Sequence, residues 1–499
     1  MSQIKIANLT FRYANQDQNL FNHLNANLDT SWKLGLVGRN GRGKTTLLNL
    51  LRGKLSGTGQ IASQTAFAYF PEVIADTANL TYSELTDTGR PELWKIKREL
   101  NLMQVDEKIL WQPFASLSGG EQTKVLLALA FAEEGAFPLL DEPTNHLDQA
   151  SRQQIAKYLR QKRTGYIVVS HDREFLNQTT DHILAIEQTE INVYQGNFAR
   201  YELTKERRDQ TNQAKNNKLQ REIGELNQSR QRIKGYSDKA EREKYAGAHQ
   251  NELVQHINRG FYSHKAAKIM QRSKNAERRM NQEIADKEGL LVNIEQVPAL
   301  SMNFTPDYHH ELLHLDKFAL SLADGRQLFH DLNISMPSQG IVALTGANGT
   351  GKTTLLRYLL GQRQGLQARG IAEQVAKLKI SYLPQQFDDY TGSLQSFAQK
   401  QHLSYSALLN NLKKMGFPRA SFATPIEQMS LGQQKRVALA KSLVEPANLY
   451  LWDEPANYLD VFNQDQLIKF LQEGKPAMIL VEHDAHFIEA VAQTTVKLG

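Results

Sequence analysis

Cysteine is absent from the 499 residues of this chain. Its absence excludes disulfides, thiolate zinc sites, iron–sulfur clusters and cysteine nucleophiles, and is typical of a cytosolic protein. No apolar run approaches the roughly 18 residues needed to cross a bilayer, so we expect no membrane span. The first residues, MSQIKIANLTF, contain no apolar signal core. We therefore expect a cytoplasmic protein and not a secreted one.

The chain has little excess of positive over negative charge, and that excess lies in one central segment. The whole chain has 59 basic and 53 acidic residues, a net charge of +6. Between Tyr201 and Leu290 there are 20 Lys/Arg and 13 Asp/Glu, so this stretch alone carries +7. A solvated helical face explains such a stretch, and a polyanion partner such as nucleic acid is the other interpretation.

The chain contains two copies of one pattern of about 200 residues. The repeated strings are GRNGRGKTT and GANGTGKTT (from Gly38 and Gly346), LSGGEQ and MSLGQQ (Leu117 and Met429), LLDEPTNHLD and LWDEPANYLD (Leu139 and Leu451), and SHD and EHD (Ser170 and Glu482). The last three pairs are each offset by 312 residues, which indicates a duplicated domain and not a solenoid.

Short apolar runs precede the repeated strings. They are Lys33–Val37, Tyr166–Val169, Gly340–Leu344 and Ala477–Val481. Runs of this length are typical of parallel strands buried on both faces, so we predict an α/β fold with two tandem nucleotide-binding domains.

Glycine, serine and proline are scarce between the two copies. Apolar residues there follow helical spacing at Leu219, Ile223, Leu226 and Ile233, and again at Ala266, Ile269, Ser273, Ala276 and Met280. We predict a long antiparallel α-helical hairpin with its tip near Tyr245, each arm reaching roughly 60 Å; a flexible linker is the alternative. The predicted division is residues 1–198, 199–298 (tip near 235–262) and 299–499.

Both glycine-rich strings match G-x-x-x-x-G-K-[ST]. We name Gly38–Thr46 the first phosphate loop and Gly346–Thr354 the second. Their backbone N–H groups would surround phosphate oxygens, with a lysine on the β- and γ-phosphates and a threonine on Mg²⁺. The predicted ATP-binding residues are Gly38, Asn40, Gly41, Gly43, Lys44, Thr45 and Thr46, with Gly346, Asn348, Gly349, Gly351, Lys352, Thr353 and Thr354.

Each copy also has carboxylates and a histidine after apolar runs. Asp141 and Asp453 fit the Mg²⁺ shell, and the following Glu142 and Glu454 fit a general base for the attacking water. His171 and His483, each 30 residues after its aspartate, fit γ-phosphate sensors that also position the water.

Two further segments, which we name the first and second signature, precede helices expected to begin near Gln122 and Gln434. A helix N-terminus with bare glycine backbone makes a second anion cradle. Their predicted ATP-binding residues are Ser118, Gly119, Gly120 and Glu121 in the first signature, and Ser430, Gly432 and Gln433 in the second.

Together these strings resemble the ATP-binding cassette (ABC) family over about 400 residues. The resemblance implies two ATP molecules held head to tail, each between the phosphate loop of one copy and the signature of the other. It also implies a Mg²⁺ ligand at Gln385 and an adenine-stacking ring at Tyr13. Glu72 stands in place of that glutamine in the first copy, and Leu431 in place of a signature glycine. We therefore expect two unequal ATP sites.

Two cassettes joined by a charged hairpin resemble the ABC-F proteins, which act on the ribosome. Glu72 to Ser118 spans 46 residues and Gln385 to Ser430 spans 45, so we expect no extra arm in the first copy, and no tail is expected after the second. These features resemble the antibiotic-resistance (ribosomal protection) branch, especially Lsa-type proteins active against lincosamides, pleuromutilins and streptogramin A. The resemblance implies a monomer that binds the E site of the 70S ribosome, reaches past the P-site tRNA into 23S rRNA and displaces drug, with ATP hydrolysis for release.

Aromatic and basic residues near the predicted tip could contact RNA or the drug site. They are Tyr236, Lys244, Tyr245, His249, Phe261 and Tyr262. Packing within the tip is the alternative for the aromatic ones. A housekeeping ABC-F translation factor and the ATPase subunit of an ABC transporter remain open as functions. A DNA-bound coiled-coil ATPase is disfavoured, because each copy carries all its own motifs.

Overall fold

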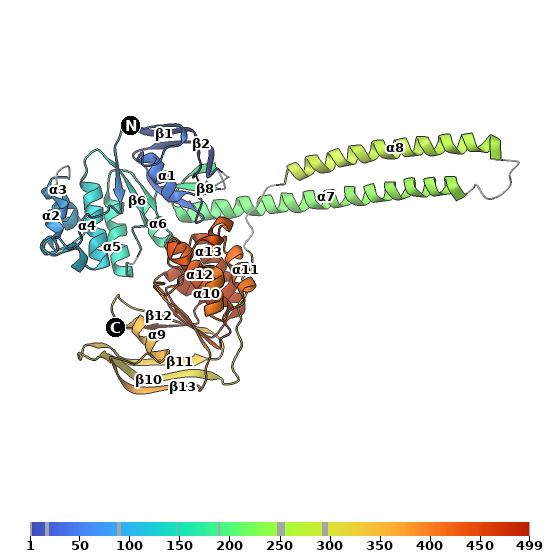
Figure 1. Ribbon diagram of the computed structural model, residues 1–499. Helices are drawn as coiled ribbons and strands as arrows, with labels where there is room; N and C mark the ends of the chain where they lie inside the picture. The colour runs from blue at the N-terminus through green and yellow to red at the C-terminus, as the bar shows by residue number, and fades with distance from the viewer. Residues whose placement is uncertain are drawn as a thin grey trace. The chain divides into compact units, whose positions relative to one another are not determined.

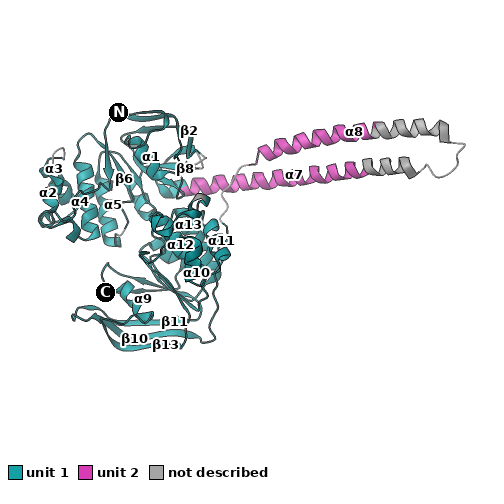
Figure 2. Cartoon of the chain, viewed as in Figure 1, with its two compact units in different colours: residues 1–201, 297–499 teal, residues 202–296 magenta. Residues whose placement is uncertain are grey.

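The computed structural model describes residues 2–14, 19–86, 91–145, 147–187, 190–246, 255–291 and 298–498. The chain divides into two compact units, residues 1–201 with 297–499, and residues 202–296 (Figure 2). Across these described ranges, no helix is both long and apolar enough to cross a membrane.

The first copy of the repeat forms an α/β domain on a six-stranded sheet (Figure 1). The strands lie in the order β5 (Phe67–Phe70), β6 (Phe137–Asp141), β7 (Tyr166–Val169), β3 (Lys33–Gly38), β8 (His182–Glu187) and β9 (Glu190–Gln195). Neighbours pair in parallel except β8 and β9. A three-stranded antiparallel sheet adds β2 (Phe21–Asp29), β1 (Gln3–Phe11) and β4 (Thr58–Ala62). The helices are α1 (Lys44–Leu51), α2 (Thr81–Leu85), α3 (Leu93–Leu102), α4 (Gly119–Ala132), α5 (Gln149–Gln161) and α6 (Arg173–Thr179).

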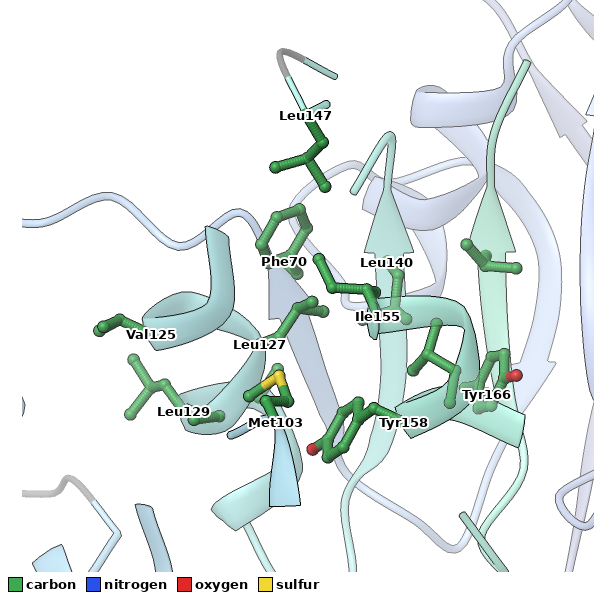
Figure 3. Packing of buried hydrophobic residues seen from close by; sticks show 14 of the residues in the cluster. Phe70, Met103, Val125, Leu127, Leu129, Leu140, Leu147, Ile155, Tyr158 and Tyr166 are labelled. Carbon is green, nitrogen blue, oxygen red and sulfur yellow. The ribbon is translucent and has the colours of Figure 1, made fainter. Parts of the chain in front are cut away.

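The parallel strands are covered on both faces, and alternate residues enter two different cores. Leu140 and Val168 pack with α4 and α5, through side chains such as Leu127 and Ile155 (Figure 3). Their neighbours Leu139 and Ile167 face the core shared by α1 and the antiparallel sheet. This alternation confirms the prediction of doubly covered strands. Because β3, β6 and β7 pair in parallel, their carboxyl ends lie at one edge of the sheet, where the repeated motifs follow.

The second copy repeats this architecture. Its parallel sheet has the order β14 (Ile380–Leu383), β15 (Leu449–Asp453), β16 (Met478–Val481), β12 (Ile341–Thr345) and β17 (Thr494–Lys497). Its antiparallel sheet has β11 (Gln327–Pro337), β10 (Glu311–Leu322) and β13 (Leu366–Gln374). The helices are α9 (Lys352–Leu359), α10 (Leu394–Lys400), α11 (Tyr405–Lys414), α12 (Leu431–Val444), α13 (Val461–Gly474) and α14 (Ala485–Val491). Two tandem α/β domains are therefore confirmed.

Two long helices, α7 (Phe198–Ala246) and α8 (Gln255–Gly289), run antiparallel. Lys287 Nζ lies 2.7 Å from Glu222 Oε2, and Arg230 donates to Asn281 Oδ1 at 2.9 Å. Residue numbers therefore increase along one helix where they decrease along the other. Their 49 and 35 residues give lengths of about 74 and 53 Å. The hairpin is confirmed over the described residues, and the flexible-linker alternative is wrong there.

The predicted seam between the arms is visible as a row of half-buried side chains. They are Leu219, Ile223, Leu226 and Ile233 on α7, with Ser273, Ala276 and Met280 on α8. Ile284 extends the row and is buried. The side chains of Ala266 and Ile269, and residues 247–254 beside the predicted tip, lie outside the described part of the chain.

Candidate active site

Both phosphate loops connect a buried strand to a helix N-terminus, as the motif predicts. Gly43 and Gly351 occupy the N-cap positions of α1 and α9 with φ of 93°. A side chain would be excluded at Gly43, because an added Cβ would lie 2.7 Å from the Phe21 ring. At Gly41 and Gly349, two residues earlier in each loop, no described atom lies within 4 Å of an added Cβ.

The lysine of each phosphate loop folds back and hydrogen-bonds oxygen atoms of its own loop. Lys44 Nζ donates to Gly38 O at 2.8 Å and to Asn40 Oδ1 at 3.2 Å. Lys352 Nζ donates to Gly346 O at 2.9 Å and Ala347 O at 2.8 Å. Both lysines are buried, and burial lowers the pKa of each. The ammonium groups are held where phosphate oxygens could replace the carbonyls as acceptors.

The carboxylates that end β6 and β15 offer oxygen ligands suited to Mg²⁺. Thr353 Oγ1 donates to Asp453 Oδ2 at 2.6 Å, and Asp453 Oδ1 is buried without a hydrogen-bond partner among the described residues. Burial raises the pKa of Asp453 to about 6. A hydroxyl, a carboxylate and an orphaned oxygen fit a hard cation. In the first copy, Asp141 hydrogen-bonds Thr45 and accepts the Tyr69 hydroxyl at 3.1 Å.

The residues at the two positions where the resemblance implies a glutamine have different surroundings. Gln385 Nε2 donates to Glu454 Oε2 at 2.9 Å and lines a cavity beside the second phosphate loop. Its counterpart Glu72 is exposed. The expected inequality between the two sites is thus visible at this position.

The candidate general bases stand on strained backbone. Glu142 and Glu454 have φ of 54° and 50°, a left-handed conformation that costs about 1–3 kcal/mol for a non-glycine residue. His171 Nε2 lies 3.1 Å from Glu142 Oε1, and His483 Nε2 lies 3.7 Å from Glu454 Oε1. Burial raises the pKa of Glu142 to about 8 and lowers that of His171 well below its usual value. Each carboxylate and its histidine are therefore close enough to hydrogen-bond the same water molecule.

The two signatures begin their helices earlier than predicted. We expected starts near Gln122 and Gln434, but α4 begins at Gly119 and α12 at Leu431. The cause is a capping box in each copy: Ser118 and Ser430 accept from the backbone three residues on, and that residue's side chain accepts the serine N–H. The signature glycines therefore lie in the first helical turn, where free N–H groups point outward.

The first phosphate loop directly contacts the second copy. Asn40 N donates to Asp460 Oδ2 at 2.5 Å, and Asn40 Nδ2 donates to Tyr458 O at 3.0 Å. A Cβ added to Gly432 of the second signature would lie 3.5 Å from Asn40 Nδ2. This phosphate loop therefore faces the signature of the other copy, as the resemblance implies.

The second phosphate loop borders an open cavity of about 490 Å³. From the first copy, Leu147 and Arg152 line this cavity, and Leu147 also lies beside Gly120 of the first signature. The lining from the second copy includes Leu322, Arg326 and Leu328. Residues of both copies thus line one cavity beside this loop, as the resemblance implies for a site shared by the two copies.

Tyr13 lies beside the first phosphate loop, where a nucleotide base could stack. Its hydroxyl is 2.8 Å from Thr46 Oγ1, its ring packs edge-on against Phe11, and the residue is 39% exposed. At the corresponding point the second copy places Leu322 on the cavity wall. A leucine offers apolar contact without an aromatic face.

Sequence reasoning missed several residues of the site. Tyr69 holds Asp141, Asn457 contacts Glu454, and Arg152 reaches the cavity of the other copy. Tyr69 stands in the YFPE string and Asn457 in DEPAN, so their motifs were visible but their roles were not. Arg152 lies in no repeated string.

The candidate tip residues are only partly described. Tyr236 lies on α7 and is 74% exposed, which leaves its ring accessible. The side chains of Lys244, Tyr245, Phe261 and Tyr262, and all of His249, lie outside the described part of the chain.

The fold and the paired phosphate loops define a two-cassette nucleotide-hydrolysing protein. The chain belongs to the ABC transporter family, whose model matches residues 21–145 and 329–457. It is 28% identical to the Ribosome protection protein VmlR of Bacillus subtilis (strain 168), over 98% of this chain and 85% of the relative. It is 27% identical to ATP-binding cassette sub-family F member 3 of Mus musculus, over 94% of this chain and 68% of the relative. Within the family the chain is an ABC-F ATP-binding protein, and it is an ATPase.

A solved structure shows the same fold. It is the crystal structure of the complex of archaeal ribosomal stalk protein aP1 and archaeal ribosome recycling factor aABCE1. The similarity has a TM-score of 0.61 and 18% identity, over 98% of this chain and 87% of that chain. At this identity it bears on the fold alone.

Proposed function

We propose that this protein is a ribosome-binding ABC-F ATPase that confers resistance to lincosamides, pleuromutilins and streptogramin A. The observation that carries the proposal is the antiparallel hairpin of α7 and α8 between two cassettes, in a segment whose residues 201–290 carry a net charge of +7. A long cationic helical pair suits contact with RNA phosphates, with little sequence readout. Similarity to a ribosome protection protein along 98% of the chain supports the same function.

ATP would close each cassette on the signature of the other, and the closed form would bind the E site of the 70S ribosome in the cytoplasm as a monomer. The hairpin of residues 199–298, between domains at 1–198 and 299–499, would extend past the P-site tRNA along 23S rRNA. Its tip would displace the drug. Hydrolysis would then reopen the cassettes and release the ribosome.

The chemistry follows from residues already placed. Each phosphate loop would bind the phosphates through its N–H groups and lysine. Glu142 or Glu454 would accept the proton of the attacking water, oriented by His171 or His483. Mg²⁺, when bound, neutralises phosphate charge; Thr45 with Asp141, and Thr353 with Asp453 and Gln385, would hold it.

Expression in a drug-sensitive bacterial host tests the proposal. We expect growth at raised concentrations of lincomycin, tiamulin and virginiamycin M, and the protein in the 70S fraction when ATP is present. Unchanged drug tolerance with retained ribosome binding would favour a housekeeping translation factor. Co-purification with membrane proteins and no 70S association would favour a transporter subunit.

Substitution of Tyr13 tests the proposed base contact in the first site. Tyr13→Ala is expected to weaken ATP binding there by roughly tenfold, because a lost base–aromatic contact costs about 1–3 kcal/mol. Tyr13→Phe keeps the ring and loses only the hydroxyl bond to Thr46, so near-normal binding is expected. Titration with a fluorescent ATP analogue, in a chain whose second loop carries Lys352→Ala, measures this site alone. Equal weakening by both variants would contradict stacking.

A further inference from the structure

The two cassettes differ in a pair of buried residues behind the candidate general base. At positions related by the 312-residue offset, the first copy has Thr123 and Ser170, and the second has Lys435 and Glu482. Neutral side chains in one copy thus correspond to a cation and an anion in the other. Lys435 and Glu482 are each only 1% exposed. A buried charge lowers stability unless an opposite charge or hydrogen bonds compensate it, so Lys435 and Glu482 must each have compensating partners.

Lys435 extends from α12 to the end of β15. Its Nζ donates to the carbonyl oxygen of Asp453 at 3.3 Å and lies 5.5 Å from the centre of the Phe387 ring. Burial lowers the pKa of this lysine to about 8, and the negative charges of Glu482, Asp453 and Glu454 oppose that shift. The lysine therefore supports the backbone of the strand end that carries the candidate Mg²⁺ ligand and general base.

Glu482 joins the segment that follows Glu454 to the segment that carries His483. Its Oε2 accepts the N–H of Ala456 at 3.0 Å, and its Oε1 accepts those of His483 at 2.8 Å and Asp484 at 3.3 Å. Hydrogen bonds to a carboxylate are about twice as strong as neutral ones. This side chain therefore constrains the separation between the candidate base and its histidine.

The first copy joins the same two segments without charge. Ser170 Oγ lies 2.9 Å from the hydroxyl of Thr144, the counterpart of Ala456, and accepts the N–H of Asp172 at 3.1 Å. Among the described residues, Thr123 donates to Gly119 O at 2.9 Å within its own helix. The histidine-to-glutamate distance is 3.1 Å in this copy and 3.7 Å in the other. Two arrangements of the same segments accompany two geometries of the candidate base.

We propose that Lys435 and Glu482 form a coupled positioning pair that sets the geometry of Glu454 and His483 for hydrolysis at the second phosphate loop. The inference rests on the role proposed above for Glu454. Loss of either charge removes part of the compensation of the other, so single substitutions are expected to be worse than a concerted return to the neutral arrangement.

The test uses a chain with Glu142→Gln, in which hydrolysis is confined to the second phosphate loop. In that background Lys435→Thr and Glu482→Ser are each expected to lower kcat for ATP about tenfold or more, with KM changed by less than about twofold. The triple variant Lys435→Thr, Glu482→Ser, Ala456→Thr copies the residues of the first cassette. It is expected to recover kcat to within about threefold of the background chain.

Lys441→Thr is the matched control. Lys441 lies on the same helix, is 8% exposed and pairs with Glu445 at 2.7 Å, away from the candidate site. Its loss is expected to lower the melting temperature without lowering kcat. If Lys435→Thr and Glu482→Ser behave in the same way, the pair is merely structural and the inference is overturned. A triple variant no better than the single ones also overturns it.

Two further variants keep the inference testable if the small replacements do not fold. Lys435→Arg retains the cation and is expected to retain kcat, whereas Glu482→Gln keeps the shape, removes the charge and is expected to lower it. Equal kcat values for these two variants would overturn the inference. Rapid hydrolysis by a chain carrying both Glu142→Gln and Glu454→Gln would instead contradict the proposed general bases.

Discussion

Replacement of both Glu142 and Glu454 by glutamine is expected to lower ATP turnover by about 100-fold or more, the scale of lost general-base catalysis. Glutamine preserves side-chain size, so contacts such as Gln385 to Glu454 need only reorient. The phosphate loops remain intact, and ATP should still bind. The protein should therefore accumulate in its closed form on ribosomes. Phosphate release at saturating ATP and sedimentation with 70S ribosomes measure the two effects.

The control for this double variant removes two carboxylates elsewhere. Glu174 on α6 and Glu489 on α14 are exposed residues, one in each cassette. Their joint replacement by glutamine makes the same change in net charge, and turnover should stay within about twofold of normal. Turnover of the Glu142/Glu454 variant within tenfold of normal would show that another group accepts the proton. Its loss from ribosomes in ATP would contradict the proposed link between closure and binding.

The strands and motifs of the cassettes were predictable because they depend on local sequence. Tyr166–Val169 is an unbroken apolar run since both of its faces are buried, and the structure places β7 at those residues. The helix starts were predicted less well. The serine of each signature and the residue three positions on form a capping box, which brings the glycines between them into the helix.

Other features depend on contacts that no local pattern contains. The left-handed backbone at Glu142 follows from the turn after β6, where Glu142 N is held by Val169 O of the next strand at 2.9 Å. The approach of Lys435 to Asp453 joins a helix to a strand 18 residues away. The Asn40 contact to Tyr458 spans 418 residues. Each of these required the three-dimensional arrangement.

Shortening the hairpin is expected to abolish drug protection while ATP hydrolysis continues. Removal of residues 223–229 from α7 and 280–286 from α8 takes one heptad from each arm. The apolar seam keeps its phase, and the reach falls by about 10 Å. The cassettes and their phosphate loops are unchanged in sequence. Drug susceptibility in the expressing host and phosphate release by the purified protein separate the two functions.

A charge exchange supplies the matched control for the shortened chain. Glu222→Lys with Lys287→Glu reverses the ion pair between the arms, in which Lys287 Nζ lies 2.7 Å from Glu222 Oε2, and leaves the length and net charge unchanged. Protection should survive this exchange, because opposite charges still face each other across the two arms and the pair lies near the surface. If the shortened chain protects as well as the full-length one, the distance that the arms span has no part in drug release. Protection would then have to arise from parts of the chain that the deletion leaves in place, the cassettes among them.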